Sequence, residues 1–70
     1  MQLTPQAIQR FRDQIAKNGG LSDGDVCRVD GMGETYVALA ETEVGEEYRR
    51  MYKIDIDKVT YHVYNRVPPS

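Results

Sequence analysis

Residues 4–20 read TPQAIQRFRDQIAKNGG, and this stretch decides the fold class. Thr4 is a favourable N-cap, and Pro5 follows at the first helical position, where its missing N–H costs nothing. The glycines at 19 and 20 end the helix because glycine readily adopts the left-handed conformation of a C-cap. Apolar residues recur at spacings of three and four, which places one apolar stripe along the helix: Ile8, Phe11 and Ile15. The stretch therefore predicts a single amphipathic helix that must pack against another element.

Beyond Gly20 the chain predicts short strands separated by turns. The expected strands cover residues 25–30, 34–42 and 47–56, and a last strand begins at Val59. In the third strand, alternation places Tyr48 and Tyr52 on the face of the two isoleucines at 54 and 56, and Arg50 interrupts that face. Residues 57–58 are expected as a tight turn or a bulge, because the apolar phase changes there.

These elements predict an α+β fold in the order α-β-β-β-β, formed by residues 1–70 as a single domain. The N-terminal amphipathic helix is expected on one face of a three- to four-stranded antiparallel meander sheet. Because one helix covers only one face of such a sheet, the other face is expected to meet water or a partner.

Composition indicates a globular protein of the cytoplasm. Hydrophobic residues make up 40% and charged residues 29% of the 70 residues. No apolar run approaches the ~18 residues that a membrane span requires, and residues 1–5 lack the features of a signal peptide. Cys27 is the only cysteine, so an internal disulfide is impossible, and this favours a reducing compartment.

The net charge of −2 conceals an uneven distribution. Residues 21–47 carry eight acids against Arg28 alone, whereas residues 48–70 carry five bases against two acids. An acidic segment of this kind is a candidate recognition surface for a basic partner, because complementary potential raises association rates and selectivity. The alternative is that these acids only keep solvent-exposed loops soluble and protect sheet edges.

Motifs for chemistry are sparse. Cys27 and His62 are the only residues of their types, and they would form a nucleophilic site only if the fold brought them together. One Cys and one His cannot complete a zinc site, and Asp23-Gly24-Asp25 lacks the spacing of a calcium loop, so these acids are expected to form a turn. We therefore predict no catalytic residue, no metal and no cofactor, and a protein that is not an enzyme.

The opening Leu3-Thr4-Pro5-Gln6-Ala7, followed by a helix and the stretch Gly31-Met32-Gly33, resembles the start of the A-type iron–sulfur carriers. Those carriers hold their cluster with several cysteines, whereas this chain has Cys27 alone. The resemblance therefore implies no cluster site here.

Two functions remain open. The favoured one is a small protein-binding module, an inhibitor or adaptor of the type found among bacteriophage and mobile-element accessory proteins, including anti-defence proteins. It would dock through the acidic segment and the open sheet face onto a protein with a basic surface, for example a nucleic-acid-binding protein. A homodimer is a further expectation, because an uncovered sheet face or edge favours self-association. The candidate partner-binding residues are Asp23, Asp25, Asp30, Glu34, Tyr36, Glu41, Glu43, Glu46, Glu47, Met51 and Tyr64.

The alternative is a small nucleic-acid-binding module that uses the tyrosines and arginines of the C-terminal strands. Two observations argue against direct binding of nucleic acid. The sequence pI is near 5.2, and simple alternation places Arg49 and Lys53 on the face opposite Arg50, so that the cations form no common stripe.

Overall fold

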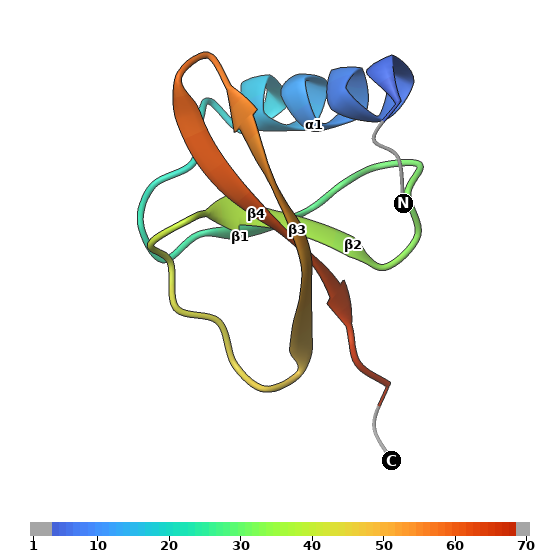
Figure 1. The fold of residues 1–70 in the computed structure, drawn as a ribbon, viewed down its shortest axis with the longest axis vertical. Helices are drawn as coiled ribbons and strands as arrows, with labels where there is room; N and C mark the ends of the chain where they lie inside the picture. Colours follow the sequence, from blue (N-terminus) through green and yellow to red (C-terminus); the bar gives the residue numbers. More distant parts are fainter. Residues whose placement is uncertain (1–3, 69–70) are drawn as a thin grey trace.

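The computed structural model describes residues 4–68 and confirms the α+β fold. Figure 1 shows one helix lying across a twisted, open antiparallel sheet. The helix covers one face of the sheet. The elements follow in the predicted order: α1 (Pro5–Lys17), β1 (Val26–Arg28), β2 (Thr35–Leu39), β3 (Tyr48–Ile56) and β4 (Val59–Arg66).

Helix α1 begins and ends where its sequence predicts. Thr4 is the N-cap, and its Oγ1 accepts a hydrogen bond of 3.1 Å from the backbone N–H of Ala7. At the other end Gly19 and Gly20 have φ values of +74° and +94°, and the N–H of Gly20 donates to the carbonyl of Ile15 over 2.8 Å. The 13 residues of α1 are too few to span a bilayer, and no other helix among residues 4–68 is long and apolar enough to do so.

The core lies between α1 and the sheet. Phe11 is fully buried on the helix and contacts Tyr52 of β3 edge to face, with ring centroids 6.5 Å apart. Removing a buried ring of this kind typically costs about 3–5 kcal/mol of stability, which makes Phe11 the principal anchor of the helix. The other buried members of this cluster come from every element except β1: Ile15, Val29, Val37, Ile54, Ile56, Tyr61 and Val63.

The order of strands in the sheet is β1-β2-β4-β3, so the predicted meander is wrong in one respect. β4 lies between β2 and β3 and pairs antiparallel with both, so β2 and β3 run in the same direction. A chain that leaves the end of β2 must return along the sheet before it can start β3. Residues 40–47 make this return, and they are therefore a crossing loop rather than a hairpin turn.

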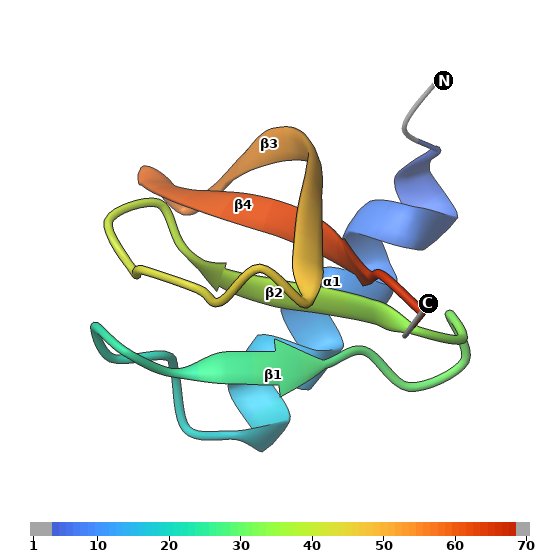
Figure 2. The same cartoon turned by 90° about the horizontal axis from the view of Figure 1, so that it is seen from below.

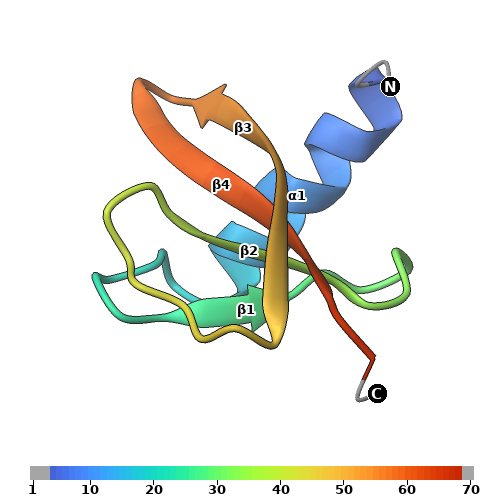
Figure 3. The same cartoon turned by 60° about the horizontal axis from the view of Figure 1, so that its bottom comes forward.

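The crossing loop also corrects the expectation of a bare second face. Figures 2 and 3 show residues 40–47 passing over β1 and β2 on the side away from α1. On that side Ala38 is fully buried and Tyr64 is only 5% exposed, while Val44 of the loop is half-buried. A single copy of this chain therefore covers part of both faces of its sheet.

A β-bulge at Met51 changes which side chains of β3 share a face. Arg50 pairs with Tyr64, but Tyr52 pairs with Val63, so Met51 is an extra residue without a partner across the strands. Residues before the bulge are consequently out of phase with those after it. Tyr48 is expected beside Tyr52 in the core, but it lies on the face of Tyr64. The bulge also explains why Arg50 interrupts the apolar face of β3 when simple alternation is applied.

The turn at Asp57-Lys58 is the predicted tight turn, and it closes a two-residue hairpin between β3 and β4. The two residues have φ values of +51° and +68°, the pattern of a type I′ turn. Aspartate tolerates this left-handed conformation, whereas it is unfavourable for lysine. Glycine is the preferred residue at the second position of such a turn.

We therefore expect Lys58→Gly to raise the free energy of unfolding by up to about 1 kcal/mol, because it removes the left-handed strain. Urea denaturation followed by circular dichroism measures the change. Asp57→Gly is the matched control, and its gain should be smaller. A Lys58→Gly variant less stable than the wild type would show that the turn is not strained.

Candidate functional site: an acidic groove

Two loops meet at the end of the sheet where β2 ends and β4 begins. Thr42 of the crossing loop is only 5% exposed and joins them. Its Oγ1 accepts a hydrogen bond from the N–H of Gly24 over 3.1 Å and donates to Asp23 Oδ1 over 3.4 Å. One buried hydroxyl thus holds together segments that lie 18 residues apart in the sequence.

The first of these loops is a turn built by its own acids, as the sequence predicts. Asp25 Oδ2 accepts a hydrogen bond of 3.0 Å from the N–H of Ser22, and the N–H of Asp25 donates back to the carbonyl of Ser22 over 3.0 Å. Gly24 has φ +96°, which a residue with a Cβ rarely adopts. The turn places Asp23 beside the crossing loop.

An open groove of about 400 Å³ lies between these loops and the β3–β4 hairpin. Polar and apolar groups line it in similar measure, and we call its apolar part, which comes from Leu39, Ala40 and Val59, the apolar floor. Val59 is 39% exposed and is one of two large hydrophobic side chains that the described chain leaves open to solvent. Asp23 and Glu41 line one side, and Lys58 lies at the hairpin. The remaining lining residue is Thr60. We call these seven residues the acidic groove.

The acidic groove has the chemistry to hold a long basic side chain. The aliphatic part of a lysine or arginine can cover the apolar floor while its charged end lies near a carboxylate. Neither ion pair that the structure has among residues 4–68 involves Asp23 or Glu41. Their carboxylates can therefore still attract a ligand, although Lys58 lines the same groove and Asp23 Oδ1 accepts a hydrogen bond from Thr42.

The structure divides the acids of residues 21–47 between different places. Asp23, Asp25, Glu41 and Glu43 belong to the two loops that meet beside the groove. Asp30 and Glu34 lie at the other end of β1 and β2; Asp30 pairs with Lys17 over 3.1 Å, and Glu34 Oε2 accepts a hydrogen bond from the hydroxyl of Tyr36 over 3.2 Å. Glu46 and Glu47 directly precede β3. The acidic segment is therefore not one continuous surface.

The candidate residues on the strands also separate. Tyr64 is buried, and its ring packs edge to face against Tyr48 at 6.5 Å, while Tyr36 packs against the same ring of Tyr48 at 5.1 Å. These tyrosines contact one another across β2, β4 and β3; Tyr64 is buried, whereas Tyr36 and Tyr48 are half-buried. Met51 is 41% exposed at the bulge, far along the sheet from the acidic groove.

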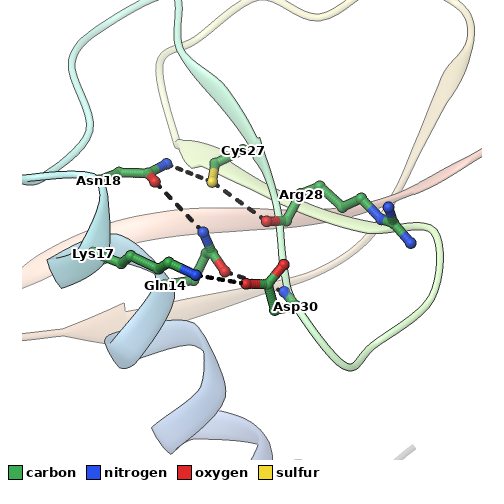
Figure 4. A network of polar contacts seen from close by, with 6 residues as sticks. All are labelled: Gln14, Lys17, Asn18, Cys27, Arg28 and Asp30. Carbon is green, nitrogen blue, oxygen red and sulfur yellow. Dashed lines mark hydrogen bonds and ion pairs between the residues drawn. The ribbon is translucent and has the colours of Figure 1, made fainter.

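Cys27 and His62 do not form a nucleophilic pair. Cys27 lies on the face of the sheet that α1 covers, whereas His62 lies on the opposite face beside Tyr64. Figure 4 shows that the sulfur contacts the side chain of Asn18 and the backbone carbonyl of Arg28. The thiol belongs to the joint between α1 and β1.

The contact between the end of α1 and the segment around β1 also explains why the polar residue Gln14 is buried. Its Oε1 accepts a hydrogen bond of 3.1 Å from the N–H of Asp30, and its Nε2 donates to Asn18 over 3.4 Å (Figure 4). Lys17 reaches Asp30 on the exposed side of this contact. These contacts hold the last turn of α1 against the loop after β1. The polar network therefore has a structural role.

Sequence reasoning missed most of the groove. Thr42 carries no signal beyond its polarity, and the apolar floor comes from residues on two strands that only the strand order brings together. The grouping of Arg50 with Lys53 was missed as well, because alternation fails across a bulge. An interrupted apolar face around Arg50 was the one available sign of that bulge.

Comparisons with known proteins yield no match to this chain: no family model, no curated protein and no solved structure is significantly similar to it. The assignment of a function therefore depends on the geometry of the molecule.

His62 lies in a locally basic environment. Its Nδ1 is 3.3 Å from the hydroxyl of Tyr64, and Arg50 and Lys53 of β3 lie near the ring. Partial burial lowers the pKa of His62 below its usual value, and the positive charges of Arg50 and Lys53 lower it further. The neutral imidazole is therefore favoured in the folded protein.

We expect replacement of Thr42 by valine to lower the free energy of unfolding by about 1–2 kcal/mol, because the N–H of Gly24 loses its acceptor in a buried place. Thr35→Val is the control, since that hydroxyl is bonded at the surface and its loss should cost less than about 0.5 kcal/mol. Urea denaturation of both variants tests this. Equal effects of the two substitutions would mean that Thr42 does not join the loops.

The position of His62 predicts a pH dependence. Because its pKa is lower in the folded than in the unfolded chain, the unfolded chain binds the proton more readily. The stability that neutral His62 contributes is full above about pH 6.5, the usual pKa of histidine, and is lost as the pH falls below it. Wild type should therefore lose more stability between pH 7.5 and pH 5.5 than His62→Gln does.

Proton NMR provides a direct check, because His62 is the only histidine. Its pKa in the folded protein should lie below its pKa in urea, and the variant Arg50→Gln/Lys53→Gln should bring the two values closer. A folded-state pKa above the unfolded one would refute the basic environment.

Proposed function

We propose that this protein is a small non-enzymatic protein-binding module that docks onto a basic protein surface through the acidic groove. The observation that carries the proposal is that Thr42 joins two acidic loops beside an apolar floor on which Val59 is exposed. Carboxylates beside open apolar surface suit a protein ligand, because side chains such as arginine supply both an aliphatic part and a charge.

Binding of this kind has an electrostatic and a packing component. The carboxylates of the two loops attract a basic partner before contact, which raises the association rate and makes it sensitive to salt. The apolar floor then contributes after contact by removing Val59 and its neighbours from water. The module would act as an inhibitor or adaptor by occupying the surface of its partner, without any chemical step.

The setting that fits the proposal is the cytoplasm. Cys27 is a free, half-buried thiol, and free thiols persist in reducing compartments. A basic partner in that setting, such as a nucleic-acid-binding protein, presents the lysines and arginines that the acidic groove would contact.

A defined basic peptide tests the groove directly. We expect a fluorescein-labelled peptide of alternating arginine and leucine to bind the wild type at 20 mM salt and to bind more weakly at 200 mM salt. In two-dimensional ¹H–¹⁵N NMR spectra, the signals of Glu41, Lys58 and Val59 should move on titration. Glu41→Lys should weaken binding roughly five- to tenfold, because an attraction becomes a repulsion inside the groove.

Glu46→Lys is the matched control, because it makes the same change of charge outside the groove. It should weaken binding less than Glu41→Lys does. Equal losses in the two variants, or signal changes spread over the whole molecule, would show that the peptide responds to net charge only and that the groove is not a binding site.

A further inference from the structure

The second surface with a marked charge lies on β3 and β4, away from the acidic groove. These two strands carry four cations and a single carboxylate, Asp55, which accepts a hydrogen bond of 2.6 Å from Thr60. Neither ion pair among residues 4–68 involves these cations. Three of the four cations lie on β3, which is an outer strand of the sheet. We therefore call the four cations the basic edge: Arg49, Arg50, Lys53 and Arg66.

The bulge at Met51 is what groups these charges. Without it Arg50 and Lys53 would lie on opposite faces, but the extra residue places both on the face of His62. Their common effect on the pKa of His62 agrees with this placement. Arg66 pairs with Tyr48 on the same face, so three cations follow the outer half of the sheet beside aromatic rings.

The fourth cation, Arg49, pairs with Asn65 on the α1 side of the sheet, on the face opposite Arg50 and Lys53, and it borders a groove at the end of the same strands. This groove has a volume of about 220 Å³ and is lined by two arginines, an amide and apolar groups, with no acid among them: Arg49, Met51, Asn65, Arg66, Val67 and Pro68. Met51 is 41% exposed there. An amide, an exposed apolar side chain and two guanidinium groups are together suited to a base and its phosphates.

We propose that the basic edge binds single-stranded nucleic acid. The phosphates would follow Arg66, Arg50 and Lys53 along β3 and β4, and a base would enter the groove at Met51 and Asn65. A single strand fits better than a duplex, because the groove accepts an unstacked base and the surface is only two strands wide. This surface is separate from the acidic groove, so the inference does not depend on the function proposed above.

The net negative charge of the chain does not oppose this binding strongly. Thr60 of β4 lines the acidic groove and Arg66 ends the same strand, so the two sites are about 20 Å apart at the usual rise of an extended strand. This exceeds the Debye length of about 10 Å at 0.1 M salt, so at that salt concentration the acids of the groove are largely screened from the basic edge. At 20 mM salt the Debye length is about as long as this separation, so the screening is weaker. The nearer acids are Glu34, whose carbonyl accepts a hydrogen bond from the N–H of Arg66 over 3.2 Å, and Glu46 and Glu47, which precede β3.

Fluorescence anisotropy with a fluorescein-labelled 15-nucleotide thymidine strand tests the proposal. We expect binding at 20 mM salt, with a slope of log K against log salt of about −2 to −3 for up to four phosphate contacts. Arg50→Gln/Lys53→Gln should weaken binding about tenfold or more. The control Arg12→Gln/Lys58→Gln lowers the net charge equally at cations away from the basic edge, and it should weaken binding less than threefold.

Glu46→Gln/Glu47→Gln provides an independent readout, because loss of the nearer acids should tighten binding and cannot do so by unfolding the protein. Circular dichroism of every variant confirms that the fold is retained. Four results would overturn the proposal: no binding at 20 mM salt, equal losses in the edge and control variants, equal affinity for a 15-base-pair duplex, or equal affinity for a labelled polyglutamate peptide of the same charge.

Discussion

The position of β4 between β2 and β3 is the constraint on which the rest of the structure depends. Because β4 pairs with both neighbours, β2 and β3 run in the same direction, and the chain must travel back along the sheet between them. The returning loop covers part of the face that α1 leaves open, and it brings Thr42 to the turn at Asp23 and Gly24. The acidic groove is thus a consequence of strand order.

The same sheet separates the charges of the molecule. The acids that flank the groove gather where β2 ends and β4 begins, whereas the cations of β3 and β4 gather along the outer strand and toward the end of β4, where Glu34, Glu46 and Glu47 are the nearest acids. Segregation of this kind leaves few ion pairs, and the two among residues 4–68 lie at exposed positions that contribute little to stability. Cohesion comes from the apolar cluster around Phe11, and the charges remain free to act on ligands.

The tyrosines illustrate how packing limits function. Tyr36, Tyr48 and Tyr64 form a chain of edge-to-face contacts across three strands on the side away from α1, in which Tyr64 is buried and the other two rings are half-buried. A small domain has few residues with which to bury surface, so an aromatic side chain such as Tyr64, which looks suited to an interface, is used for packing instead. The ligand-facing groups are then the charged side chains at the rim.

The helix and its caps could be predicted from the sequence, and so could a tight turn or a bulge at Asp57-Lys58, because each depends on residues near one another in the chain. The sequence also determined which side chains of β2 and β4 face the core, since strict alternation holds along those strands. The strand order, the bulge at Met51 and the meeting of Thr42 with Asp23 could not be predicted from the sequence and follow from the fold. These depend on which distant segments pair, and the free energy of that pairing comes from contacts that no local pattern encodes.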